Sequence, residues 1–132
     1  MKKAYIEYCI DGYNLIEKEI FDLYNQLNEI KQETQEIFKA PFGLDIVIEG
    51  VGRISIGLAE QTVLCYKSDD YEIQLTAVGN MDAQGETMFY FGDYSLMSNK
   101  YLISFDLGIE IINEWIKCGI LSMKVNWTEE IL

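Results

Sequence analysis

Apolar residues recur every three or four positions over residues 13–38, which is the spacing of one face of an amphipathic helix. The stripe consists of Tyr13, Ile16, Ile20, Leu23, Leu27, Ile30, Thr34 and Ile37. A short apolar run at residues 4–10 precedes it and predicts a strand, with Asp11-Gly12 as the turn. The single proline of the chain, Pro41, follows the stripe and would stop a helix. The pattern therefore predicts one long helix over residues 13–38.

The period then changes to two, which is typical of strands with one buried face. The predicted strands are residues 44–49, 53–58, 62–66, 71–77 and 86–91. Gly50-Val51-Gly52 separates the first two and predicts a hairpin. Because the connections are short, we expect these strands to be antiparallel neighbours in one meander.

A second helix is predicted after Ser104, which is a favourable N-cap. Asp106 lies in its first turn, and Gly119 follows its last turn as a C-terminal stop. Residues 92–103 have no clear pattern, and residues 121–127 predict a final strand. We therefore predict one α+β domain over residues 1–132: an antiparallel meander sheet with a long N-terminal helix and a second helix near the C-terminus, both packed on one face.

The stripe at 13–38 also has a heptad-like spacing, which allows a second interpretation. In that interpretation the helix pairs with a partner helix, and the chain is a non-enzymatic acidic interaction or regulatory module that forms a homodimer. A helix lying on the sheet is favoured, because the stripe is short for a coiled coil and the strands need a cover.

Composition excludes several kinds of function. The 132 residues include no histidine, which removes histidine-based catalysis and histidine metal ligands. There are 22 acidic and 10 basic residues, for a net charge of −12. Such a chain is repelled by nucleic-acid phosphate and by anionic membranes, so we expect no direct binding to either. The charge favours a basic protein partner.

Neither a metal site nor a reactive thiol is indicated. Cys9, Cys65 and Cys118 are widely spaced, and without a histidine to activate them they are expected to be buried thiols in a reducing compartment. No signal peptide is visible after Met1, so we expect a cytoplasmic protein. The acidic turn at 69–72 lacks the pattern of a calcium loop. We expect no cofactor, no metal and no catalytic residue, and an enzyme that uses carboxylates and a divalent metal is the least favoured alternative.

The last forty residues carry a resemblance. Gly92-Asp93-Tyr94 precedes residues 98–103 (SNKYLI), then a helix ending in Trp115-Ile116, a Gly119 stop and a closing Val125-Asn126-Trp127. This order resembles the Imm1 family of bacterial immunity proteins, and the resemblance extends over residues 50–128. The prolines expected near residues 104 and 121 are absent.

The resemblance implies an immunity protein that is not an enzyme. It would bind a cognate polymorphic toxin domain, such as a nucleic-acid deaminase, and block its active site. An acidic inhibitor suits the basic groove of such a toxin. We expect the toxin-binding surface to combine acids and aromatics from the loops, with acids pairing with toxin Lys and Arg side chains. The candidate residues are Asp69, Asp70, Asp82, Asp93 and Tyr94.

Overall fold

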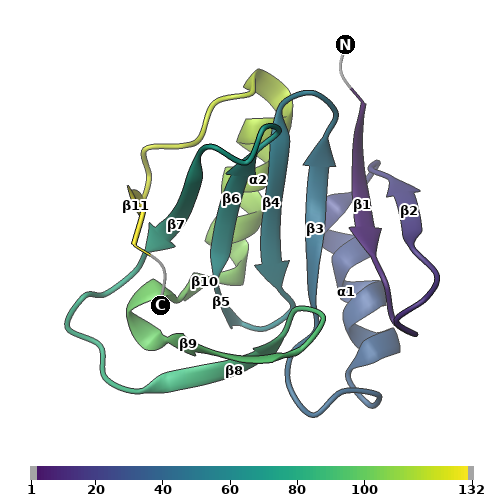
Figure 1. The fold of residues 1–132 in the computed structure, drawn as a ribbon, viewed down its shortest axis with the longest axis horizontal. Coiled ribbons are helices and arrows are strands. Elements are labelled where there is room, and N and C mark those ends of the chain that lie inside the picture. The colour runs from purple at the N-terminus through teal and green to yellow at the C-terminus, as the bar shows by residue number, and fades with distance from the viewer. Residues whose placement is uncertain (1–2, 131–132) are drawn as a thin grey trace.

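The computed structural model describes residues 3–130, and its main element is a seven-stranded, fully antiparallel sheet (Figure 1). The order of its strands is β11-β7-β6-β4-β3-β1-β2. Their bounds are β1 Ala4–Tyr8, β2 Ile16–Glu19, β3 Gly43–Ile48, β4 Gly52–Gly57, β6 Leu64–Ser68, β7 Gln74–Val78 and β11 Asn126–Thr128. The short strands β2 and β11 form the two edges of the sheet.

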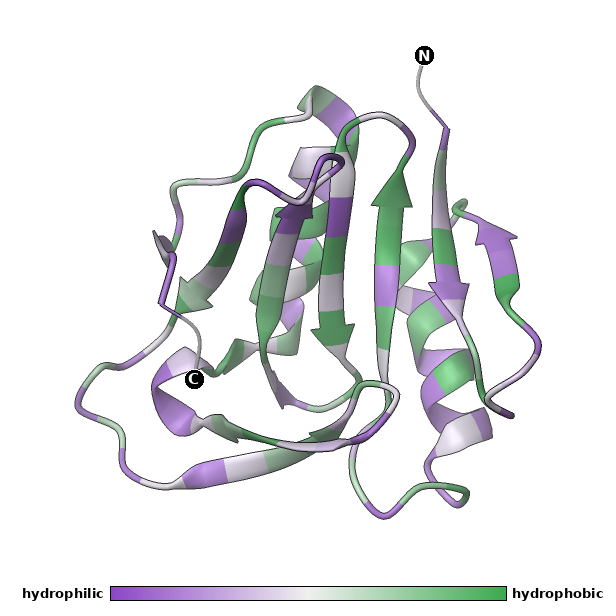
Figure 2. Cartoon of the chain, viewed as in Figure 1, coloured by the Kyte–Doolittle hydropathy of each residue, from purple (hydrophilic) through white to green (hydrophobic). Residues whose placement is uncertain are grey.

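Two helices, α1 (Leu23–Thr34) and α2 (Phe105–Cys118), lie behind the sheet in Figure 1 and cover one of its faces. Apolar and polar residues alternate along the strands (Figure 2), and the apolar ones point toward the helices. The residues that are fully buried there include Ile6, Ile46, Ile54, Ile56, Leu64, Ala77, Leu27, Ile111 and Ile112. We call this side of the sheet the covered face.

Among residues 3–130, the opposite side, which we call the open face, is covered at one end, mainly by the hairpin β8–β9 (β8 Glu86–Tyr90, β9 Tyr94–Ser98). A cross-strand pair of glycines makes this contact possible, since Gly43 and Gly57 are directly opposed in β3 and β4. A Cβ on Gly43 would lie 2.1 Å from the Phe91 ring, and a Cβ on Gly57 would lie 2.5 Å from the Phe89 ring. The hairpin therefore packs directly on the sheet backbone.

The prediction of one long helix over residues 13–38 is wrong. Residues 16–19 form β2 and pair with β1, and α1 begins only at Leu23, with Asp22 as its N-cap. Gln26 fixes the change of direction, because its side-chain oxygen accepts from the backbone N–H groups of Phe21 and Asp22, both at 3.1 Å. Pairing with the sheet edge outweighs the local helical period in this segment.

Two further details of the predicted meander are wrong, although the α+β class holds. β8 does not extend the main sheet but pairs with β9, which arises from the segment without a clear pattern. The rest of that segment forms a short 3₁₀ turn, η1 (Asn99–Tyr101), and β10 (Ile103–Ser104), which pairs with β5 (Gln61–Thr62). The hairpin β3–β4 and the helix α2 are confirmed, including the Ser104 cap and the left-handed Gly119 stop at φ 72°.

Candidate binding surface

The strand register assembles two rows of mostly polar residues on the open face. The row nearer the hairpin consists of Glu17, Glu7, Asp45, Ser55, Cys65 and Thr76. The next row consists of Glu19, Tyr5, Val47, Arg53, Lys67 and Gln74. Within a row, neighbouring side chains from adjacent strands are close enough to interact. The open face therefore presents carboxylates, cations and hydroxyl groups where the covered face presents aliphatic side chains.

Arg53 organises the centre of this surface. Its Nη1 lies 3.1 Å from Glu7 Oε1 and 2.8 Å from Asp45 Oδ2, while Ser55 Oγ donates a hydrogen bond to the other oxygen of Asp45. Partial burial alone would lower the pKa of Arg53, but the hydrogen bonds to Asp45 and Glu7 outweigh burial and raise the pKa. The two carboxylates thus share one permanent cation, an arrangement that holds side chains in place.

An open groove of about 540 Å³ lies between the open face and the hairpin. Cys65 and Thr76 line it from the sheet, Ser95 and Met97 from β9, and Leu15 from the loop before β2. Burial raises the pKa of the Cys65 thiol, whose Sγ lies 3.8 Å from Thr76 Oγ1. A thiol with a raised pKa is a poor nucleophile at neutral pH, so Cys65 is not activated for covalent chemistry.

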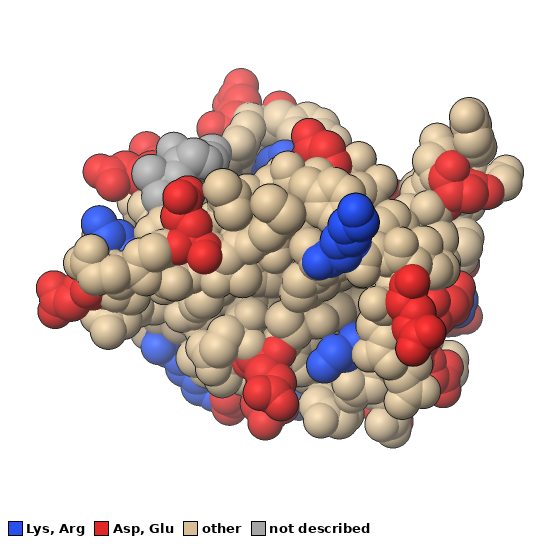
Figure 3. All heavy atoms as spheres, turned by 90° about the horizontal axis from the view of Figure 1, so that it is seen from below, with Lys and Arg blue, Asp and Glu red and all other residues tan. Residues whose placement is uncertain are grey.

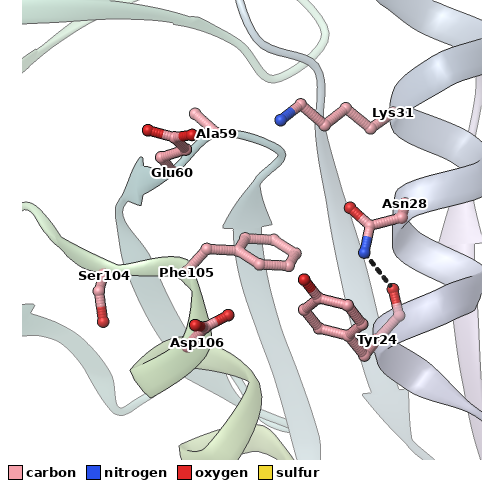
Figure 4. Close-up of a pocket in the computed structure, with 8 residues that line it drawn as sticks. All are labelled: Tyr24, Asn28, Lys31, Ala59, Glu60, Ser104, Phe105 and Asp106. Carbon is pink, nitrogen blue, oxygen red and sulfur yellow. Dashed lines mark hydrogen bonds between the residues drawn. The ribbon is translucent and has the colours of Figure 1, made fainter.

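A smaller hollow of about 360 Å³ lies between α1 and the N-terminal end of α2 (Figure 4). Its aromatic contact is an edge-to-face pair of Tyr24 and Phe105, with ring centroids 6.1 Å apart. Lys31 extends from α1 toward the side of the hollow that holds Glu60, whereas Asp106 lies near the aromatic pair. The polar groups of this hollow do not converge on one point, in contrast to the three side chains around Arg53.

Two of the predicted site residues, Asp69 and Asp70, lie in the turn between β6 and β7. The Asp70 carboxylate accepts from Ser68 Oγ at 2.6 Å and from the backbone N–H of Glu72 at 3.0 Å. These two hydrogen bonds, the one from Ser68 first, lower the pKa of Asp70. Asp70 therefore stabilises the turn, while the Asp69 side chain is exposed.

Asp93 and Tyr94 lie at the turn of the hairpin. The Asp93 carboxylate accepts from Ser95 Oγ at 2.8 Å, and Tyr94 Oη accepts from the backbone N–H of Lys39 at 3.2 Å. The Tyr94 ring lies 5.0 Å from that of Tyr90, which stacks on Phe38 at 4.3 Å. Tyr94 thus helps to attach the hairpin to the segment that follows α1.

The predicted site residues do not form a single surface. The Asp69 N–H bonds to Val51 O beside the start of β4, whereas the hairpin that carries Asp93 and Tyr94 packs on Gly57 at its end, roughly 17 Å away along the strand. Asp82 lies in the loop between β7 and β8. In a view from below, acidic side chains are scattered rather than gathered into one patch (Figure 3). The structure brings Asp93 and Tyr94 together, and Asp69 and Asp70, but not the two pairs.

The sequence did not single out Glu7, Asp45, Arg53 and Ser55 as candidate site residues. The sequence feature that could have indicated them is that they occupy polar positions in three strands in which apolar and polar residues alternate. Only the strand register shows that these positions are neighbours.

Among residues 3–130, no three or more Cys, Asp or Glu side chains are grouped so as to hold a metal ion. No helix in the described part of the chain is both long enough and apolar enough to cross a membrane. Comparison with protein-family models, curated proteins and solved structures finds no match to this chain. The geometry and charge of the open face are therefore the features from which a function can be inferred.

Proposed function

We propose that this chain is a bacterial immunity protein, which binds a cognate polymorphic toxin domain with a basic surface and blocks its active site. A nucleic-acid-targeting toxin, such as a deaminase, is the partner class that the Imm1 resemblance implies. The observation that carries the proposal is the open face, which is an ordered polar surface with a groove. The chain that presents this surface has a net charge of −12. The proposed site of action is the cytoplasm, where such a toxin would meet its target.

Charge supports a basic partner in two ways. A net charge of −12 steers a basic protein toward the chain at low salt, which raises the association rate. The two rows on the open face hold four carboxylates, those of Glu7, Glu17, Glu19 and Asp45, against the two cations Arg53 and Lys67. Lys and Arg side chains of a partner would find acceptors on this face.

The same face gives little support to catalysis. The Cys65 thiol has a raised pKa, and the carboxylates of Glu7 and Asp45 are both engaged with Arg53. A general acid–base pair needs two groups whose environments differ, and here one guanidinium serves both. We therefore propose a binding protein rather than an enzyme.

Dimerisation through a helix at 13–38 is not retained. That helix does not exist as one element, and the side chains that would form its seam, Leu23, Leu27 and Ile30, are at most 4% exposed because they pack against the sheet. A seam that lies in the core cannot pair with a second copy without unfolding the domain.

The test is co-expression with the toxin domain encoded beside this chain. We expect the toxin domain alone to stop growth and this chain to restore it, and the purified complex to weaken as salt is raised. A toxin domain that kills despite this chain would overturn the proposal.

Two neighbouring substitutions on β9 test whether the groove is the binding surface. Ser95 lines the groove, whereas Leu96 is adjacent in the strand and exposed outside it. Ser95→Arg places a cation and a bulky side chain in the groove and should weaken toxin binding by about tenfold or more, which corresponds to about 1.4 kcal/mol. Leu96→Arg adds the same charge and should change affinity by less than about twofold. Equal effects would remove the groove from the interface.

A further inference from the structure

The edge strand β2 is flanked by exposed aromatic side chains. Tyr13 is 92% exposed and Phe21 is 84% exposed, the highest values of any aromatic residue among those described. Leu15, 61% exposed, lies immediately before the strand. Isolated apolar residues on a surface are ordinary, but here two large ones precede a four-residue edge strand and one follows it, where they could contact a strand added at this edge.

The backbone of β2 is available for pairing. β2 has β1 on one side and no further strand of the described chain on the other. In an antiparallel edge strand, alternate residues direct their N–H and C=O groups away from the sheet, where a strand of another chain can bond to them. β2 therefore offers hydrogen bonds that the described chain does not satisfy with a strand.

The segments on both sides of β2 are already ordered. The Asp11 carboxylate accepts from the backbone N–H groups of Tyr13 and Asn14, both at 2.8 Å. At the other end, the Gln26 side chain donates to Glu19 O at 2.9 Å and accepts from the N–H groups of Phe21 and Asp22. An edge held at both ends loses little conformational entropy when a partner strand adds to it.

Pairing with a second copy is disfavoured by charge. A two-fold antiparallel register centred on Lys18 places Lys18 against Lys18 and Glu17 against Glu19 of the other copy. A register centred on Glu17 places Glu17 against itself. Like charges directly opposed destabilise a strand pair, so the side chains of β2 act against self-association in these two registers.

A basic strand has the opposite effect. Glu17 is opposed to Glu7, and Glu19 to Tyr5, so both carboxylates lie on the open face. A strand with Lys or Arg at every second position would place its cations beside Glu17 and Glu19 and its backbone against β2. Leu15 also lines the groove, so this edge is continuous with the proposed binding surface.

We propose that β2 accepts an extended segment of the toxin domain with Lys or Arg at alternate positions, which becomes an eighth strand of the sheet. The partner's identity rests on the proposed function. The pairing geometry rests on β2 itself. Glu17 and Glu19 supply the charge recognition, and Tyr13, Leu15 and Phe21 supply apolar contacts at the two ends.

The first experiment uses a fluorescent ten-residue peptide of alternating Lys and Val. Two control peptides are used. The first has the same composition but carries its lysines in a single block. The second has the alternating sequence but is methylated on alternate backbone nitrogens, so that it cannot extend a sheet. We expect the alternating peptide to bind at least about tenfold more tightly than either control. Amide hydrogen exchange should slow at residues 15–19 in the bound state. Equal binding of all three peptides, or no protection at β2, would overturn the edge proposal.

The second experiment uses paired charge reversals. Glu17→Lys with Glu19→Lys changes β2, and Glu129→Lys with Glu130→Lys makes the same charge change beyond β11, at the opposite edge. All four side chains are exposed, so both variants should fold. Should the β2 reversal not fold, Glu17→Gln with Glu19→Gln removes the charge alone. We expect the β2 variant to weaken toxin binding by at least about tenfold and to lose growth rescue, while the β11 variant changes affinity by less than about threefold.

The two proposals fail in different ways. If the original chain rescues growth and the β2 variant does so with unchanged affinity, the edge proposal is wrong and the immunity function stands. If the original chain does not rescue growth, the immunity function is wrong. The peptide result then decides the edge proposal without reference to the toxin.

Discussion

The two faces of the seven-stranded sheet come from the same strands but differ in burial and in polarity. On the covered face, Ile6, Ile46 and Ile54 are fully buried against the helices. On the open face, Glu7, Asp45 and Arg53 are half-buried and joined by ion pairs. Because side chains alternate along a strand, adjacent residues lie on opposite faces and can contribute differently to stability. Substitutions on the open face are therefore expected to disturb the fold less than substitutions on the covered face.

The largest expected effect tests this separation at two adjacent residues of β4. Ile54→Ala should lower the free energy of unfolding by about 2–5 kcal/mol, because it removes buried methyl groups and leaves a cavity. Ser55→Ala should cost about 1 kcal/mol, the value of its hydrogen bond to Asp45. Urea unfolding curves measure both. Similar losses for the two variants would show that the open face is as important for stability as the covered face.

One glycine-to-alanine substitution on each face should change the free energy of unfolding by a smaller amount. The change should be a loss on the open face and a gain on the covered face. Gly43→Ala places a Cβ 2.1 Å from the Phe91 ring on the open face and should cost about 1–3 kcal/mol, because the hairpin must shift. Gly108→Ala lies in α2 on the covered face, where the nearest atom, Ile56 Cδ1, is 3.4 Å away. There the higher helix propensity of alanine should add up to about 1 kcal/mol.

Thermal unfolding monitored by near-ultraviolet circular dichroism measures the stability of both glycine variants. A Gly43→Ala protein with unchanged stability would mean that the hairpin is not held closely against the sheet. A destabilised Gly108→Ala protein would mean that α2 packs more tightly on the covered face than the 3.4 Å contact indicates.

The parts of the fold that follow from the sequence are those with local causes. The hairpin β3–β4 follows from strict alternation around a glycine turn, and α2 follows from the Ser104 cap, an apolar face and Gly119. Each signal lies within a few residues of the structure that it specifies. Such elements form in the same way whatever the rest of the chain does.

The N-terminal segment shows why a helical period is not sufficient. Ile16 and Ile20 fit the helical stripe, yet residues 16–19 pair with β1 at the sheet edge. The period of a few residues cannot show that the free edge of β1 lies beside them in space. The same limit applies to β8, because the pairing of Gly43 with Gly57 and the resulting space for Phe89 and Phe91 appear only once β3 and β4 are in register.

The candidate site was harder to predict than the fold. Acids in turns, such as Asp69 and Asp70, stand out in the sequence because they are adjacent. Glu7, Asp45 and Arg53 are far apart in the chain and meet only across strand pairs. A surface on a sheet is assembled by register, so its composition is determined by long-range pairing rather than by any local motif.

The smallest expected effect is a pH dependence of stability that arises from Asp11, in the loop before β2. A variant on the covered face serves as its control. Hydrogen bonds from the backbone of Asn14, then from the backbone of Tyr13, lower the pKa of Asp11 from 3.8 to about 2. Because the folded pKa lies below the unfolded one, the carboxylate stabilises the folded loop above about pH 4, and this contribution is lost as the pH falls toward 2.

Titration of the Asp11 carboxyl by NMR should give a midpoint near 2, and Asp11→Asn should remove the pH dependence in this window. The control is Ile54→Ala, which should keep the pH dependence of stability in this window, because it leaves Asp11 unchanged and removes no titrating group. A midpoint near 3.8 would show that the loop before β2 is not held by Asp11, and the proposed pairing edge would then lack its N-terminal anchor.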